Sequence, residues 1–284
     1  MTQPFTIFTL ASARSGTSFI ADFFQRNVLD CYSTHEPYLT PGNPVLFGKP
    51  IEWNTCHEDM KLLPVLQKKC RFIKQCKQPV YFEANHAFLK AFNRHAPQML
   101  ENAGFIHLIR NPKQVAKSEW LREQVIRRFH IPFIDYVSDK GQLLFRWSLT
   151  GEEPLYQQFA ENSGGYPLSR FGFYILQWFE IEYRAQQLQQ HHGWKESTFV
   201  LDVKTDLHKE NTLHDMLDFF GLNHKLRFDM NLHRNKTWFA GSSDLTESEH
   251  QEFRQIIRHL PEDYLHMLGQ SPYSDSSFAS VFVE

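Results

Sequence analysis

Short apolar runs alternate along the chain with longer segments in which apolar residues recur at helical spacing. Apolar runs of about four to eight residues between turn residues are typical of buried strands, and longer amphipathic segments are typical of helices. The pattern predicts strands at 5–10, 28–32, 80–84, 104–109 and 198–203. It predicts helices at 17–25, 59–76, around 88–92, and at 112–129, 171–191 and 212–220. Because strands and helices alternate, we expect an α/β fold, a P-loop-like doubly wound parallel sheet flanked by helices.

Three segments depart from this alternation. The segment 33–50 is rich in Pro and Gly and is predicted to form a long loop, and 131–167 has the mixed pattern of a lid or a binding-site wall. The segment 246–268 is predicted to be a helical C-terminal tail. Since the sequence shows no repeat and no linker, we expect residues 1–284 to form a single domain.

The composition limits the classes of partner that the protein is expected to bind. The net charge of −2 offers no broad basic surface for nucleic acid or anionic lipid, so any anion must be bound locally. The four Cys residues form no C-x-x-C pair, which favours reduced thiols in a cytoplasmic protein. The first ten residues lack the basic start of a secretory signal, and no apolar stretch approaches the ~18 residues of a membrane span.

The first predicted strand is followed by Ala13-Arg14-Ser15-Gly16-Thr17-Ser18. A strand that ends in a small-residue turn and opens a helix directs backbone N–H groups and the helix dipole at an anion. The turn differs from the nucleotide-triphosphate P-loop, G-x-x-x-x-G-K-[ST], because Ala11 replaces the first Gly and Thr17 stands at the Lys position. With a cation at Arg14 instead, the turn favours an anionic ligand that lacks a γ-phosphate.

A second strand-to-helix junction lies at Arg110-Asn111-Pro112. Asn111 is a favourable helix N-cap and Pro112 suits the first helical position, so Arg110 is predicted at the carboxyl end of a strand. Open α/β sheets bind their ligands at that edge. Ser118 follows about two turns into the helix, and an Arg fork with a hydroxyl can bind a second phosphate.

Together these motifs resemble those of the sulfotransferases that use 3′-phosphoadenylyl sulfate (PAPS). In that family a strand–loop–helix reading R-S-G-[TS]-[ST] holds the 5′-phosphosulfate, and a later R-[DN]-P-x-x-x-x-x-S unit holds the 3′-phosphate. The resemblance implies transfer of a sulfuryl group to an acceptor hydroxyl, most plausibly of a carbohydrate or glycolipid. It also implies a set of cofactor-binding residues: Arg14, Ser15, Gly16, Thr17, Ser18, Arg110 and Ser118.

The transfer requires a general base, and the resemblance points to Glu36. Carbohydrate and tyrosine sulfotransferases place a Glu base about twenty residues after the motif Arg, and Glu36-Pro37 follows Arg14 at a similar interval. His35 is a rival, since His accepts protons near neutrality, and His86 is a third possibility. Arg14 is expected to hold the sulfate oxygens and to stabilise charge on the bridging oxygen.

The sequence also offers candidates for closing over the cofactor, for facing the acceptor and for stacking on the adenine. Arg234 and Lys236 lie where relatives carry a basic loop that closes over the cofactor, but an ordinary charged loop would look the same. The segments 40–77 and 120–166 are expected to face the acceptor, and no metal site is expected. The aromatic residue that stacks on the adenine is left open between three residues: Trp53, Trp120 and Trp238.

Two other functions remain possible from the sequence. One is a P-loop kinase, against which Thr17 counts because it replaces the phosphate-binding Lys. The other is a nucleotide-binding protein that has lost catalysis and acts as a partner module, against which the intact Arg14, Glu36, Arg110 and Ser118 count.

Overall fold

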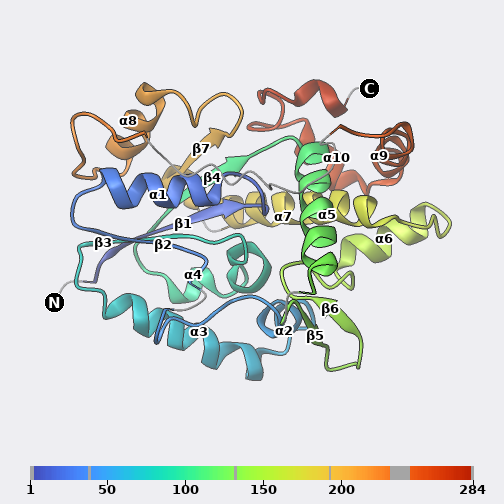
Figure 1. Cartoon of the computed structure of the whole chain (residues 1–284), viewed down its shortest axis with the longest axis horizontal. Coiled ribbons are helices and arrows are strands. Elements are labelled where there is room, and N and C mark those ends of the chain that lie inside the picture. Colours follow the sequence, from blue (N-terminus) through green and yellow to red (C-terminus); the bar gives the residue numbers. More distant parts are fainter. Residues whose placement is uncertain (1–2, 38–39, 131–132, 192, 231–243, 283–284) are drawn as a thin grey trace.

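The computed structural model describes residues 3–37, 40–130, 133–191, 193–230 and 244–282. A five-stranded parallel sheet in the order β2-β3-β1-β4-β7 lies at its centre (Figure 1). Its strands are β1 (Phe5–Ala11), β2 (Cys31–His35), β3 (Val80–Ala84), β4 (Ala103–Ile109) and β7 (Thr198–Asp202). With helices on both faces, this is the α/β architecture that the sequence predicts.

Helices cover both faces of the sheet, which explains why β1 is a nearly continuous apolar run. Ile7 packs with the cluster under α1 (Thr17–Asn27) and α8 (Glu210–Phe219), whereas Phe8 packs into the larger cluster on the opposite face. Figure 1 shows α1 and α8 on one side of the sheet and α3 (Asp59–Lys74) on the other. The helices are α1 (Thr17–Asn27), α2 (Lys49–Thr55), α3 (Asp59–Lys74), η1 (Phe88–Phe92), α4 (Ala96–Met99), α5 (Pro112–Arg128), α6 (Pro154–Asn162), α7 (Arg170–His191), η2 (Trp194–Ser197), α8 (Glu210–Phe219), α9 (Glu247–His259), α10 (Glu262–Leu268) and η3 (Ala279–Phe282).

The predicted second strand at 28–32 is wrong by about three residues, because β2 begins at Cys31. Val28 instead ends α1, where its N–H donates to the carbonyl of Phe24, and it forms an isolated bridge with His224. Since β2 is an edge strand whose residues are all only half-buried, its sequence CYSTH lacks an apolar signature. The shift places His35 at the last strand position and Glu36 directly at the carboxyl edge of the sheet.

The remaining segments differ in detail from the sequence pattern. The mixed segment after α5 contains a hairpin of β5 (Asp135–Val137) and β6 (Leu143–Phe145), followed by α6. The C-terminal tail is helical, but it divides at Pro261 into α9 and α10. Among the helices that the structure describes, none has the length and apolar composition that crossing a bilayer would require.

Candidate functional site

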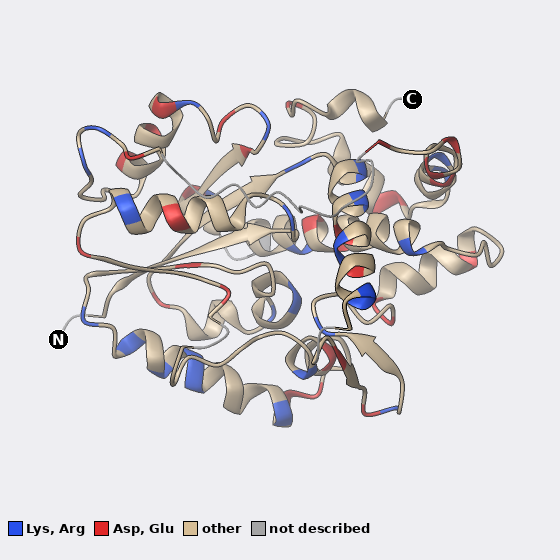
Figure 2. Ribbon diagram, viewed as in Figure 1, with Lys and Arg blue, Asp and Glu red and all other residues tan. Residues whose placement is uncertain are grey.

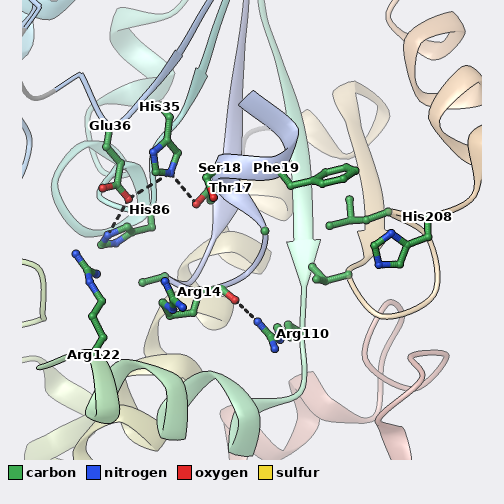
Figure 3. A pocket seen from close by; sticks show the side chains of 14 residues that line it. Arg14, Thr17, Ser18, Phe19, His35, Glu36, His86, Arg110, Arg122 and His208 are labelled. Atoms are coloured by element: carbon green, nitrogen blue, oxygen red, sulfur yellow. Dashed lines mark hydrogen bonds and ion pairs between the residues drawn. The ribbon is translucent and has the colours of Figure 1, made fainter. Parts of the chain in front are cut away.

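A cavity of about 350 Å³ opens at the carboxyl edge of the sheet. It is lined by residues that follow all five strands of the sheet and by α1 and α5, so the chain brings together turns that are far apart in sequence (Figure 3). The lining residues are Ala13, Arg14, Gly16, Thr17, Ser18, Phe19, His35, Glu36, His86, Arg110, Arg122, Val203, Leu207 and His208.

The turn between β1 and α1 forms the floor of this cavity. Arg14 and Gly16 both have left-handed backbones, with φ of 63° and 82°. Gly16 is the N-cap of α1, and a Cβ added there would lie 2.8 Å from Cδ1 of Leu207. Glycine is therefore favoured by conformation and by space, and the turn presents the positive end of the α1 dipole to the cavity.

The hydroxyl groups of this turn point in different directions. Ser15 is fully buried and its Oγ lies 2.8 Å from Oγ of Ser12, so the side chain of Ser15 is held below the turn. Thr17 and Ser18 line the cavity, and Oγ1 of Thr17 lies 3.1 Å from Nε2 of His35. Ser15 can therefore offer its backbone rather than its hydroxyl to a ligand, whereas Thr17 and Ser18 can offer both.

The two predicted anion-binding arginines meet in this cavity. Arg110 follows β4 and its guanidinium donates to the backbone carbonyl of Arg14 (Figure 3). Nε of Arg14 donates to Oγ of Ser118 at 2.9 Å. Ser118 is not among the lining residues that the structure describes, so it contacts the cavity through Arg14. Burial lowers the pKa of both guanidinium groups, and the charge of Arg122 lowers that of Arg14 further.

The three candidate bases also lie together. Oε1 of Glu36 is 3.2 Å from Nε2 of His86 and 3.7 Å from Nε2 of His35 (Figure 3). Glu36 has a φ of 42°, a left-handed conformation that is strained for a residue other than glycine. This conformation follows the end of β2, where the N–H of Glu36 donates to the carbonyl of Ala84.

His86 is the most deeply buried of these groups. The residue is only 1% exposed, and within the described residues neither ring nitrogen meets hydrogen-bond geometry with a partner, despite the short distance to Glu36. Burial lowers the pKa of His86 well below its ordinary value, and the charges of Lys90 and Arg122 lower it further. Burial also lowers the pKa of His35, against the opposing effect of Glu36. Both rings are therefore uncharged near neutral pH.

Some lining residues were missed by the sequence analysis. Arg122 lies one helical turn beyond Ser118 on α5, a spacing that could have revealed it. His208 and Leu207 follow β7, and Phe19 lies in the first turn of α1, where its ring stands 6.2 Å from that of His208. These residues give the cavity an apolar and aromatic end, on the side away from Glu36 (Figure 3).

The cavity is also locally cationic. Charges of both signs are spread over the helices of the described chain (Figure 2). Among the described residues that line the cavity, three are Arg and a single one, Glu36, is acidic. An anion is therefore favoured in this cavity, in keeping with the expectation from the net charge of −2 that an anion would be bound locally.

Other candidates lie away from the cavity or outside the described residues. Trp53 packs against the core and donates to Asp139, and Trp120 lies under Lys117, so neither lines the cavity. Arg234, Lys236 and Trp238 lie outside the described residues. In the described part of the chain, no group of three or more His, Cys, Asp or Glu residues could hold a metal ion.

Comparisons with known proteins add little to this geometry. The chain matches no protein-family model and shows no significant similarity to curated proteins. Among solved structures it is similar to a sulfotransferase from Alicyclobacillus acidocaldarius, with 15% identity over 92% of this chain and 95% of that chain and a TM-score of 0.48. A likeness at this level does not establish what this chain does.

Proposed function

We propose that this chain is a PAPS-dependent sulfotransferase that moves a sulfuryl group to an acceptor hydroxyl, with Glu36 as general base. One observation carries the proposal. Arg14 and Arg110, 96 residues apart in sequence, are joined by a hydrogen bond in a single cavity that also contains Glu36. A donor with two phosphate positions would require two separate anion-binding turns. Proton transfer from the acceptor hydroxyl would require a carboxylate beside them.

The chemistry of the lining residues fits this donor. Gly16 lines the cavity without a side chain between its backbone and a ligand, and the arginines would supply charge to both phosphate positions. The aromatic end formed by Phe19 and His208 suits a nucleotide base. When bound, PAPS would supply an activated sulfuryl group, and the residues of the turn would hold its 5′ side.

The residues of the chain would share the work of transfer. Glu36 would accept the proton of the acceptor hydroxyl, and its partly exposed carboxylate lies at the cavity edge where an acceptor could reach it. Arg14 would stabilise the negative charge that develops on the donor side. His35 and His86, both uncharged near neutrality, contact the same carboxylate and are the alternative proton acceptors.

The acceptor is proposed to be a carbohydrate or a glycolipid. The two segments expected to face it, 40–77 and 120–166, lie against each other, because the N–H of Gly48 donates to the carbonyl of Arg146 at 2.8 Å. Phe47 from the first segment lies 5.0 Å from the ring of His86. These contacts support an acceptor site beside Glu36, opposite the end of the cavity formed by Phe19 and His208.

The first test is thermal stabilisation by nucleotides. A ligand that binds only the folded state raises the melting temperature by mass action. We expect 3′,5′-ADP to stabilise the protein more than 5′-AMP or ATP with Mg²⁺, because it engages both arginines. A preference for ATP with Mg²⁺ would support a P-loop kinase instead, and no shift with any of the three would remove the proposed function.

The second test separates an enzyme from an inactive nucleotide-binding module. Radiolabelled PAPS should transfer its sulfuryl group to a member of a sugar and glycolipid panel in the wild-type protein. A protein that binds 3′,5′-ADP but transfers nothing to any acceptor, and shows no slow hydrolysis of PAPS, would favour the partner module.

A further inference from the structure

Arg122 has a different environment from the other two arginines of the cavity. It lies on α5, partly buried, and its side chain rises toward His86 and Glu36 rather than toward Arg110 (Figure 3). Within the described residues its side chain forms no hydrogen bond and no ion pair. Its guanidinium instead lies 4.9 Å from the centroid of the Trp147 ring.

Trp147 is not among the described residues that line the cavity, but it packs behind Arg122 with other aromatic residues. Its ring centroid lies 6.3 Å from that of Phe47, which in turn contacts His86. Nζ of the fully buried Lys90 donates to the carbonyl of Trp147 at 2.6 Å and so fixes its backbone. The Trp147 ring, which Arg146 also contacts, therefore supports the guanidinium of Arg122, whose N–H groups can bind a planar anion in the cavity.

Among the described residues, the nearby acids form no hydrogen bond or ion pair with this group, although the charge of Arg122 acts on Glu119. Glu119 is buried one helical turn away, but its carboxylate accepts from Nε2 of Gln177 at 3.1 and 3.0 Å. Glu36 is the acid that lines the cavity, and its contacts are with the two histidines. A partly buried guanidinium without an acidic partner is an energetically favourable position for an anion from a ligand.

We infer that the acceptor carries an anionic group, a carboxylate or an acid ester, which Arg122 binds at the end of the cavity where Glu36 lies. The inference rests on the proposed function and deepens it by naming the class of acceptor. The donor has no need of Arg122, because Arg14 and Arg110 already flank the β1–α1 turn. An acid bound by Arg122 would place a neighbouring hydroxyl beside Glu36.

Binding of matched acid and amide pairs tests the inference. With the nucleotide site saturated by 3′,5′-ADP, the dissociation constants of 4-hydroxybenzoate and 4-hydroxybenzamide, and of glucuronate and glucuronamide, are measured by calorimetry. Saturation prevents the acids from occupying the sites of Arg14 and Arg110. In at least one pair we expect the acid to bind about tenfold or more tightly than its amide.

Variants assign the preference to one residue. Arg122→Gln should remove the advantage of the acid while leaving affinity for the amide and for 3′,5′-ADP unchanged, and Arg122→Lys should restore part of it. Arg128→Gln, at an exposed position in the last turn of the same helix, is the matched control and should change neither.

Three other results would contradict either the inference or the proposed function. Equal binding of acid and amide in every pair would overturn the inference while leaving the proposed function intact. A loss of 3′,5′-ADP affinity in Arg122→Gln would place Arg122 in the donor site, which also overturns it. Failure of 3′,5′-ADP to bind the wild-type protein would instead remove the proposed function on which the inference rests.

Discussion

The two ends of the cavity are built in opposite ways. At the end formed by the β1–α1 turn, the charged groups are fixed by contacts with each other: Arg110 donates to the carbonyl of Arg14, and Arg14 donates to Ser118. At the other end, the ring nitrogens of His86 and the guanidinium of Arg122 make no hydrogen bonds within the described residues.

The difference indicates which end is preorganised and which depends on a ligand. A site whose dipoles and charges are already oriented can stabilise an anion without further reorganisation. Buried polar groups without partners are rare in folded proteins, so those of His86 mark a place where a ligand or water would complete the hydrogen bonds. We therefore assign the fixed end to the donor and the unsatisfied end to the acceptor and the proton transfer.

Replacing the proposed base tests the acceptor end most severely. Glu36→Gln keeps the size of the side chain but removes the proton acceptor, so sulfuryl transfer should fall by about 10²–10⁴. Affinity for 3′,5′-ADP, measured by calorimetry, should be nearly unchanged because the donor end is intact. Glu101→Gln, at an exposed site, is the control. A large loss of nucleotide affinity would show that Glu36 supports the structure of the donor end.

The donor end is tested through Arg110. Arg110→Ala should weaken binding of 3′,5′-ADP by about 1.5–3 kcal/mol, the range for hydrogen bonds to charged groups. Binding of 5′-AMP should weaken less, because 5′-AMP has no 3′-phosphate and loses only the support that Arg110 gives to the turn through its hydrogen bond with the Arg14 carbonyl. If calorimetry shows equal losses for both nucleotides, Arg110 does not recognise the 3′-phosphate.

Two glycine variants separate the effect of close packing at the donor end on stability from the effect of backbone conformation. Gly16 and Gly141 have nearly equal φ, 82° and 80°, but a Cβ at Gly141 would have nothing within 4 Å. Both Gly→Ala variants should be destabilised by about 1–2 kcal/mol through the left-handed backbone, and Gly16→Ala by more because it displaces Leu207. Denaturant unfolding measures the difference. Equal free energies of unfolding in the two variants would mean that Leu207 moves aside at no cost.

The buried His86 at the acceptor end should make the stability of the folded protein depend on pH. Burial lowers the pKa of His86 well below 6.5 in the folded protein, so below that pH the unfolded chain binds a proton that the folded protein does not. Stability is therefore lost as the pH falls, by at most about 1.4 kcal/mol per pH unit for this group. Melting temperatures measured from pH 7.5 to 5.5 should fall less steeply in His86→Gln than in the wild-type protein. Parallel curves would show that His86 takes up its proton in the folded state.

The sequence analysis succeeded where a feature depends on neighbouring residues. It placed β3 at its observed bounds and α5 at its observed start, because apolar runs and the Asn111-Pro112 start signal are local. It misplaced β2, whose half-buried edge residues carry no apolar pattern. It left the adenine-stacking residue open among tryptophans, whereas Phe19 and His208 form the aromatic end of the cavity.

By itself, then, the sequence determined two strand-to-helix turns, since glycine at Gly16 and the helix starts after Gly16 and Arg110 follow from local backbone preferences. The tertiary structure alone decided which groups meet. The strand order puts β3 between β2 and β1, which brings Glu36 to His86, and the packing of α5 turns Arg122 toward them. Such contacts join residues that are distant in the chain, and they depend on how the sheet is ordered and its faces are filled rather than on any local pattern.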